Sequence, residues 1–293
     1  MMEVCRAGFV PGTSITGDPM AHALDPAKAL HTWSLFRTMG RYVAPGSAPS
    51  GVLTEHDSAD GLPLLELPGQ LAAHGFVSAQ LCHFYLPRTE ASYLAELRDA
   101  FDTAGVDLEC FLVDDGDVIH PEQGEEQQRW LSGWIDVAEQ LGAPRVRVPA
   151  GDQEPTDETL ALSARRLRAL ATSHPDIRVI TENWKSLLVD AATTRRLLDQ
   201  VDGEVGLLID TGNWGGDDKY EQIAAVAGEA ECSQVKAREI SPGVLDEEDL
   251  TRSLSVLQDV GYAGRISLVY AGTDDDEWAR LDQMHEIARD VTG

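Results

Sequence analysis

EVGLLIDTGNWGG, residues 204–216, is a run of apolar residues that ends abruptly in polar ones. Such a run is typical of a strand that is buried on both faces in a parallel sheet. Asp210 follows the run directly, and Gly212 and Asn213 place a sharp turn and an amide behind it. In a barrel of parallel strands this position is the C-terminal rim, where catalytic groups lie. The alternative is that Asp210 only caps the following helix.

Segments with strand and helix character alternate along the rest of the chain. Eight strands, each followed by a helix, predict a closed α/β barrel of the (β/α)8 or TIM barrel type. The strands are expected at residues 31–36, 77–86, 107–113, 145–151, 177–182, 205–209, 232–236 and 265–270. An open, doubly wound sheet would fit the alternation almost as well, but no GxGxxG motif follows the first strand. The sequence therefore favours the barrel.

The chain of 293 residues is long enough for one large domain. Residues 1–29 are rich in Gly, Pro, Thr and Ala, which predicts a loosely ordered N-terminal arm before a single barrel domain at 30–293. The sequence contains no run of about 18 apolar residues and no secretory signal, so we expect a cytoplasmic protein without a membrane partner. Widely spaced cysteines near strands, Cys82, Cys110 and Cys232, indicate buried thiols.

The formal net charge of −27 limits the kinds of partner. A surface this acidic repels phosphate backbones, which excludes nucleic acid as the expected partner. A small-molecule substrate remains the expected ligand. The sequence leaves the oligomeric state open, and a homo-oligomer is among the alternatives.

Polar side chains stand at the ends of the expected strands, and in a barrel they would converge on one mouth. In chain order they are His83 and Tyr85; Asp114, Asp115 and Asp117; Arg147; Glu182 and Asn183; Asp210 and Asn213; Gln234, Lys236 and Arg238; and Tyr270. Burying so many polar groups without partners would cost free energy, which indicates a functional site. Glu182 and Asp210 end neighbouring strands about 4.8 Å apart, so both could reach one divalent cation or divide acid and base work.

Several of these residues also have a purely structural interpretation. Glu182 could form an ion pair with Arg147 or Lys236, since buried charges are normally paired. His83 could be a hydrogen-bonded residue without a catalytic role. The aspartates after residue 113 are expected to form a solvated loop or a helix cap, with a second metal site as the less favoured alternative.

The tryptophans divide into two groups. Trp130 and Trp134 lie four residues apart on one expected helix face, which predicts that they belong to the core. Other aromatic residues could either wall the mouth for a ring-shaped ligand or pack in the ordinary way. These are Trp33, Trp184, Trp214 and Tyr270.

Four motifs in this order resemble the xylose-isomerase-like sugar phosphate isomerase/epimerase family of TIM barrels. They are TENW at 181–184, IDTGN at 209–213, QVKA at 234–237 and GYAGRISLVY at 261–270. The resemblance implies a divalent metal, Mn, Mg, Zn or Co, with a Glu, an Asp, a His or Gln, and a second Glu as ligands. The first three fall on Glu182, Asp210 and Gln234. The fourth falls on Val269, which cannot coordinate a metal, so the implied metal is in doubt.

The resemblance implies an isomerase or epimerase that acts on a small polyhydroxylated or keto substrate. The epimerases of the family use carboxylates from the fifth and eighth strands, and Val269 leaves this chain with one of them. Glu182 would then abstract a proton next to a carbonyl group, and a cation, Lys236 or Arg147 would stabilise the enediolate. In a lyase on the same scaffold, His83, Lys236 or Tyr270 would be an additional acid or base. Substrate contacts are expected from Arg147, Asn213, Trp184, Trp33 and Arg238.

Three other functions fit less well. One is a lyase, dehydratase or rearrangement enzyme of secondary metabolism on the same scaffold, which could work without a metal. The second is a non-catalytic barrel that has lost its metal site, which Val269 suggests. An endonuclease of the related abasic-site class is disfavoured by the negative charge and by the few histidines at the rim.

Overall fold

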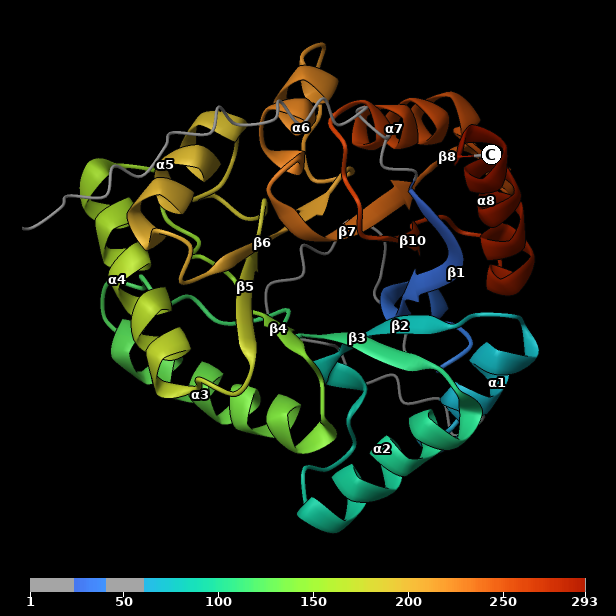
Figure 1. Cartoon of the computed structure of the whole chain (residues 1–293), viewed down its shortest axis with the longest axis horizontal. Helices are drawn as coiled ribbons and strands as arrows, with labels where there is room; N and C mark the ends of the chain where they lie inside the picture. The colour runs from blue at the N-terminus through green and yellow to red at the C-terminus, as the bar shows by residue number, and fades with distance from the viewer. Residues whose placement is uncertain (1–23, 41–60, 293) are drawn as a thin grey trace, which may run out of the picture.

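The computed structural model describes residues 24–40 and 61–292. Eight parallel strands form a closed barrel in the order β1-β10-β7-β6-β5-β4-β3-β2 (Figure 1). They are β1 (Asp25–His31), β2 (Ser78–Cys82), β3 (Asp107–Leu112), β4 (Arg145–Arg147), β5 (Arg178–Glu182), β6 (Gly206–Asp210), β7 (Ala230–Ala237) and β10 (Arg265–Tyr270). This arrangement confirms the predicted TIM barrel.

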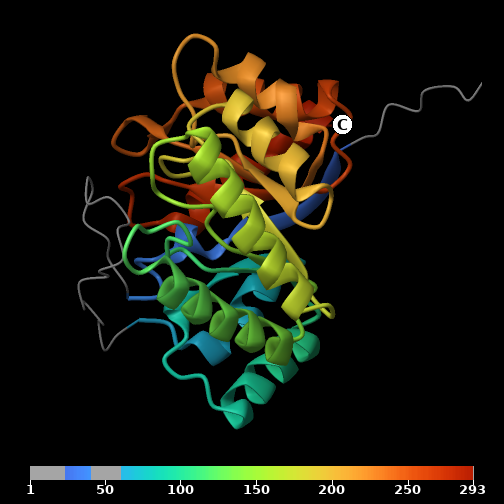
Figure 2. The same cartoon turned by 90° about the vertical axis from the view of Figure 1, so that its left-hand side faces the viewer.

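Helices surround the barrel and cover the outer faces of its strands (Figures 1 and 2). They are α1 (Leu67–Ala73), α2 (Ala91–Ala104), α3 (Gly124–Leu141), α4 (Asp157–Ser173), α5 (Ala191–Val201), α6 (Lys219–Ala227), α7 (Glu247–Asp259) and α8 (Glu277–Thr292). Each buries an apolar stripe at helical spacing, such as Leu160, Leu167 and Leu170 of α4. A small hairpin, β8 (Glu239–Ser241) and β9 (Val244–Leu245), follows β7.

The first strand lies earlier in the chain than the sequence indicated. Residues 25–31 form β1, and the predicted strand at 31–36 is instead the short 3-10 helix η1 (Thr32–Leu35). Alanine and lysine are weak strand formers, so the pattern DPAKALH gave little signal, and pairing with β2 and β10 decides the structure. Of the predicted arm at 1–29, residues 1–23 lie outside the described residues and 25–29 belong to the barrel.

A layer of polar side chains crosses the inside of the barrel below the rim. Gln80 Nε2 donates to Glu109 Oε2 over 3.1 Å, and Ser267 Oγ donates to the same oxygen over 3.0 Å. Gln234 Nε2 donates to Gln80 Oε1 over 2.9 Å. Because these groups satisfy one another, the barrel can hold polar residues without unpaired donors in this layer.

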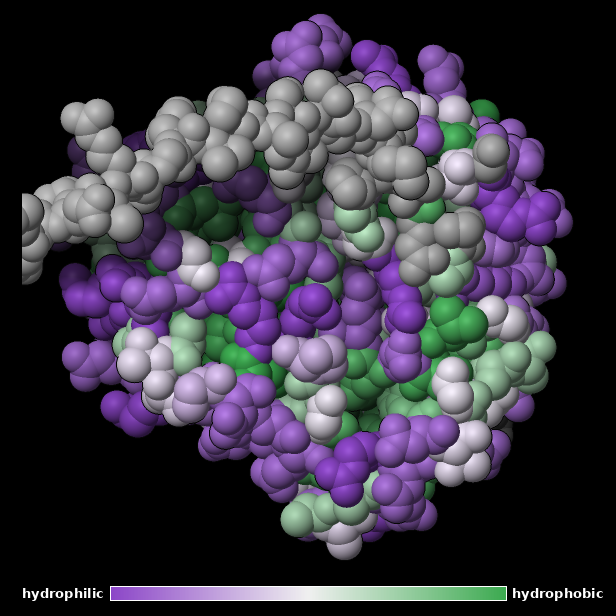
Figure 3. All heavy atoms as spheres, in the orientation of Figure 1, coloured by the Kyte–Doolittle hydropathy of each residue, from purple (hydrophilic) through white to green (hydrophobic). Residues whose placement is uncertain are grey.

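Two further expectations and one surface feature concern the described part of the chain. Cys82, Cys110 and Cys232 are buried free thiols, as predicted. None of the helices within residues 24–40 and 61–292 has both the length and the apolar character that a membrane crossing requires. Hydrophilic residues dominate the described part of the face shown in Figure 3, and hydrophobic ones appear there in smaller groups.

Candidate active site

A cavity of about 90 Å³ lies where the C-terminal ends of the barrel strands converge. Its lining consists of strand-end residues and residues that follow strands, namely His31, Trp33, Asp114, Arg147, Glu182, Trp184, Asp210, Asn213, Gln234, Lys236 and Val269. Parallel strands of a barrel deliver their last residues to one rim, so residues far apart in the sequence meet here. The two carboxylates Glu182 and Asp210 therefore share one cavity.

Two polar side chains link these carboxylates. Asn213 Nδ2 donates to Glu182 Oε1 over 2.5 Å. Lys236 Nζ donates to Asn213 Oδ1 over 3.0 Å and lies 2.6 Å from Asp210 Oδ2. The backbone N–H of Gly212 donates to Asp210 Oδ1 over 2.7 Å. A side chain would not fit at Gly212, because a Cβ atom there would lie 2.6 Å from Lys236 Cδ and 2.7 Å from its Cβ.

Arg147 holds Glu182 from another strand end. Its side chain is 1% exposed, and its Nε lies 2.9 Å from Glu182 Oε2. Its Nη2 donates to Asp114 Oδ1 over 2.6 Å, and its Nη1 donates to the carbonyl oxygen of Val113 over 2.6 Å. The ion pair that the sequence offered as an alternative for Glu182 is thus present. Because it forms part of the cavity wall, it does not exclude a role for Glu182 in chemistry.

The two acidic partners of Arg147 ionise very differently. Burial raises the pKa of Glu182 to about 7; Arg147 opposes this rise and Asp210 adds to it. Burial also acts to raise the pKa of Asp114, but the Arg147 guanidinium, together with His83 and His31, outweighs it and holds that pKa well below its usual range. The cavity therefore contains one carboxyl group that exchanges a proton near neutrality beside another that stays ionised.

Aromatic side chains form part of the wall. Trp184 follows Glu182 in a tight turn, in which the Trp184 N–H donates to the Glu182 carbonyl oxygen over 2.8 Å. Lys185 continues the turn with a left-handed φ of 60°, which is uncommon for a residue with a side chain. The turn places the Trp184 ring centroid 5.3 Å from the Arg147 guanidinium carbon. Trp33 contributes a second aromatic surface from η1.

Tyr270, a predicted acid or base, lies outside the cavity. Alternate residues of a strand point to opposite faces, and its neighbour Val269 is the one that lines the cavity. The Tyr270 hydroxyl donates to Glu239 Oε1 over 2.6 Å and accepts from the backbone N–H of Asp274 over 2.8 Å. These bonds fix the hairpin that begins at β8 against β10.

His83 and Arg238 also lie outside the cavity lining. His83 belongs to the 3-10 helix η3 (His83–Tyr85), and its Nδ1 lies 3.6 Å from Asp114 Oδ2. The same nitrogen accepts from the backbone N–H of Asp114 over 3.2 Å. Arg238 is exposed, and its Nη2 donates to the carbonyl oxygen of Gly212 over 2.7 Å. His83 therefore contacts Asp114, and Arg238 contacts Gly212, without lining the cavity themselves.

One of the tryptophan expectations needs correction. Of the two alternatives for Trp214, ordinary packing holds, because it is buried and its Nε1 donates to the carbonyl oxygen of Leu188 over 3.0 Å. Trp130 is not a core residue: it is 39% exposed, with its ring centroid 5.9 Å from that of His83. Trp134, one turn further along α3, packs against the core as predicted.

His31 is a cavity residue that the sequence did not indicate. The sequence places it at the start of a strand, whereas it is the last residue of β1 and therefore stands at the rim. Asp114 is among the residues expected at the mouth, and it lines the cavity, but the expectation of a solvated loop is wrong, because it is 8% exposed and paired with Arg147. The signal that places Asp114 at the mouth is the directly preceding buried strand, the same signal that identified Asp210.

The residues at the family's metal position fit a divalent cation poorly. Asp210 already has the Lys236 ammonium at 2.6 Å, and Glu182 has the Arg147 guanidinium at 2.9 Å. Val269, which lines the cavity, takes the place of an anionic ligand. With the Asn213 amide on Glu182 Oε1 and the Gly212 N–H on Asp210 Oδ1, every oxygen of the two carboxylates already has a partner and none is left for a metal. We therefore derive no chemistry from a metal bound by Glu182, Asp210 and Gln234.

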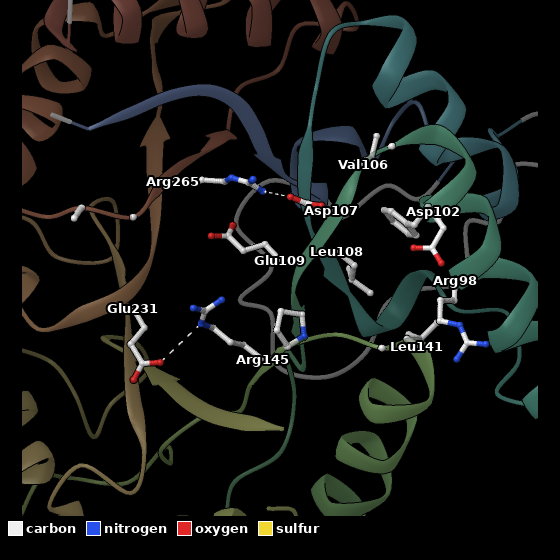
Figure 4. A pocket seen from close by; sticks show the side chains of 16 residues that line it. Arg98, Asp102, Val106, Asp107, Leu108, Glu109, Leu141, Arg145, Glu231 and Arg265 are labelled. Carbon is white, nitrogen blue, oxygen red and sulfur yellow. Dashed lines mark hydrogen bonds and ion pairs between the residues drawn. The ribbon is translucent and has the colours of Figure 1, made fainter. Parts of the chain in front are cut away.

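A larger cavity, of about 750 Å³, lies at the opposite end of the barrel, where the strands begin (Figure 4). Opposite charges are paired around it. Arg265 Nη1 lies 2.7 Å from Asp107 Oδ2, and Arg145 Nε lies 3.8 Å from Glu231 Oε2. In TIM barrels the N-terminal end contributes mainly to stability, whereas chemistry belongs to the C-terminal end. The smaller cavity is therefore the candidate active site.

Residues 69–286 match the model of the xylose isomerase-like TIM barrel family. The chain belongs to this family. The resemblance of the four motifs is thereby confirmed. None of the curated proteins matches the chain in sequence.

Solved structures share the fold of this chain at low sequence identity. A 3-keto-D-glucoside 4-epimerase from E. coli is 15% identical, with a TM-score of 0.63, over 78% of this chain and 94% of that one. A family protein from Mycobacterium smegmatis in complex with magnesium is 15% identical, with a TM-score of 0.62, over 93% and 99%. A probable 3-DHS dehydratase from Bacillus anthracis is 10% identical, with a TM-score of 0.61, over 91% and 99%. At these identities the likeness establishes the fold and not the reaction.

Proposed function

We propose that this protein is an isomerase of small polyhydroxylated or keto substrates in which Glu182 moves a proton next to a carbonyl group. The observation that carries the proposal is the state of Glu182, a buried carboxyl group in the cavity wall whose pKa burial raises to about 7. A group is most effective as a general base when its pKa lies near the working pH. Glu182 can therefore both accept and return a proton at neutrality.

The charged neighbours of Glu182 suit the intermediate of such a reaction. Removing a proton next to a carbonyl group leaves negative charge on the carbonyl oxygen. Lys236 and Arg147 line the same cavity and are held in place by Asp210 and Asp114, at 2.6 Å in each pair. Positive groups fixed in position before the reaction stabilise such an oxyanion without reorganisation.

The composition of the wall favours isomerisation over inversion at one carbon. Inversion by two bases needs a second base on the opposite side of the carbon, and β10 presents the apolar Val269 to the cavity. With Glu182 alone, the abstracted proton returns to the neighbouring carbon. We infer that the carbonyl group and the hydroxyl group of the substrate exchange places.

The size of the cavity limits what it can enclose. Its volume of about 90 Å³ equals the share of liquid volume of roughly three water molecules. We infer that it receives the reacting carbons of a substrate, while Trp33 and Trp184 offer flat surfaces to the adjoining carbon chain or ring.

Exchange of substrate hydrogen with solvent tests the proposal. In D2O the wild-type protein is expected to place deuterium next to the carbonyl group of at least one compound in a panel of aldoses, ketoses and keto sugars, as followed by proton NMR. The Glu182→Gln variant should lose at least roughly 100-fold in rate. Glu109→Gln is the matched control, because Glu109 is also buried but lies in the polar layer below the rim. Equal rates for Glu182→Gln and the wild type would contradict the proposal.

Elimination of water is the second candidate, and Lys236 supports it. Its ammonium group lies 3.0 Å from Asn213 Oδ1, and Asn213 in turn contacts Glu182, so a proton donor stands near the base. Such a donor could protonate a departing hydroxyl group. Mass spectrometry of the products separates the two reactions, because elimination lowers the mass by one water and isomerisation leaves it unchanged.

A further inference from the structure

Three side chains beside the cavity carry atoms that bind transition metals. His31 ends β1, Cys82 ends β2, and Asp114 follows β3, so they come from neighbouring strand ends of the barrel. One potential ligand atom of each lies within 4.8 Å of those of the other two. His31 Nε2 lies 3.1 Å from Cys82 Sγ. The proposed proton transfer by Glu182 makes no use of this cluster, apart from the contact of Asp114 with Arg147.

A carboxylate oxygen of the cluster lacks a hydrogen bond. Asp114 Oδ2 is buried and has no hydrogen-bond partner among the residues that the structure describes. A metal bound through His31 Nε2 would give Asp114 Oδ2 a partner, whereas the other unpaired atom, His31 Nδ1, would face away from it. The His31 side chain as a whole is 6% exposed. Buried polar atoms are almost always paired in proteins, so unpaired ones need an explanation, and an absent ion is one of the explanations that recur.

The distances suit a tetrahedral metal. Bond lengths of about 2.3 Å to sulfur and 2.0–2.2 Å to nitrogen or oxygen place tetrahedral ligand atoms roughly 3.4–3.6 Å apart. The separation of 3.1 Å between His31 Nε2 and Cys82 Sγ is close to this value, so small side-chain rotations would suffice. Arg147 contacts Oδ1 of Asp114, whereas Oδ2 has no hydrogen bond, with His83 Nδ1 3.6 Å away, and could bind as a single ligand atom.

The charge of the cavity also leaves room for a dication. Its lining carries three carboxyl groups, on Asp114, Glu182 and Asp210, and two cations, on Arg147 and Lys236. When all are ionised the net charge is negative by one unit. A divalent metal bound with a Cys82 thiolate adds one positive unit and brings the lining to neutrality, which removes the penalty of an uncompensated buried charge.

We propose that His31, Cys82 and Asp114 form a three-ligand site for a transition-metal dication of the zinc class. A set of one nitrogen, one sulfur and one oxygen ligand suits zinc or cobalt and is unsuited to magnesium or calcium. His31 and Asp114 also line the cavity, so the fourth coordination position faces the substrate space. Three protein ligands and an open position are the arrangement of catalytic zinc sites.

Cobalt(II) tests this proposal, because a thiolate bound to cobalt gives a charge-transfer band in the near ultraviolet. The full-length protein, stripped of metal with a chelator, is titrated with Co2+ and followed by absorption. We expect one Co2+ per chain, with the thiolate band and the visible bands of a tetrahedral site. Cys82→Ser should abolish the thiolate band. Cys232→Ser is the matched control: it removes another buried thiol, from β7, and should leave the spectrum unchanged.

Two further variants make the result decisive. His31→Gln should weaken Co2+ binding by at least tenfold, and it replaces the Cys82 variant if that protein does not fold by circular dichroism. Glu182→Gln should keep the band although it removes the proposed base, so failure of the catalytic proposal and failure of the metal site are distinguishable. A wild-type spectrum without a thiolate band, or a band that survives Cys82→Ser, would overturn the proposal.

Discussion

The ionisation of Glu182 reflects opposing influences, and their balance predicts the pH dependence of activity. Burial raises its pKa to about 7, while Arg147 favours the ionised form. Only the ionised carboxylate accepts a proton, so the rate of solvent exchange should rise with pH through about 7 and then level off. Arg147→Met removes the favourable charge and should move the midpoint to higher pH. A midpoint near the usual value for glutamate would contradict this account.

The poor fit of the family metal position can be reversed by mutation. Lys236→Met removes the ammonium group beside Asp210, and Val269→Glu restores an anionic ligand from β10. In the double variant the metal position then offers only oxygen ligands, from Glu182, Asp210, Gln234 and the glutamate introduced at 269, and such ligands suit Mn2+. The double variant should bind Mn2+ at least tenfold more tightly than the wild type, as measured by electron paramagnetic resonance. Adding Asp210→Asn should abolish the gain; tight binding by the wild type at this position would refute the interpretation.

Several residues of the site could be predicted from the sequence because a buried strand ends in a polar side chain. This rule brought together Glu182, Asp210 and Arg147. It failed for Tyr270 because one residue along a strand reverses the direction of the side chain, and sequence alone did not fix which of 269 and 270 faces inward. The rule placed Asp114 at the mouth as well, but it could not show that Asp114 is buried, because its partner Arg147 is distant in sequence.

At the scale of single elements, helix α4 offers a direct test of local stabilisation. Thr156 Oγ1 accepts from the backbone N–H of Thr159 over 3.1 Å, and Thr159 Oγ1 accepts from that of Thr156 over 2.8 Å. Such a reciprocal cap satisfies two N–H groups at the helix start. Thr156→Ala should lower the free energy of unfolding by about 1 kcal/mol in urea titrations.

A matched substitution separates the capping effect from the loss of a threonine side chain. Thr251 is exposed within α7, where no capping bond depends on its side chain among those described. Thr251→Ala should be neutral or slightly stabilising, because alanine is the better helix former. Equal destabilisation by both substitutions would show that the cap contributes nothing.

The positions of most elements could be predicted because apolar periodicity is strong along this chain. The exception, β1, shows the limit of the method. Its residues DPAKALH carry almost no strand preference, and the hydrogen-bonded neighbours β2 and β10 that hold it come from distant parts of the sequence. The error had a functional consequence, since His31 at the end of β1 was not recognised as a rim residue.

At the scale of the whole molecule, the formal net charge of −27 predicts a salt effect on stability. Like charges on a compact surface repel one another, and salt screens them beyond a Debye length of about 10 Å at 0.1 M. Raising NaCl from low ionic strength to about 0.1 M should therefore increase the free energy of unfolding in urea. The same osmolality of sucrose controls for non-ionic effects. A fall in stability with salt would show that the described ion pairs outweigh the repulsion.

Because Gly212 has no side chain, Lys236 can pack directly against its Cα, so the residues at 212 and 236 depend on each other. A methyl group there would meet the aliphatic stem of Lys236 at 2.6 Å and displace its ammonium group from Asp210 without altering any charge. Gly212→Ala alone should therefore perturb the cavity, and a shorter side chain at 236 would not relieve the clash, because its Cβ would still lie 2.7 Å away. We therefore expect residue 212 to stay glycine in every lineage of this protein in which residue 236 carries a Cβ.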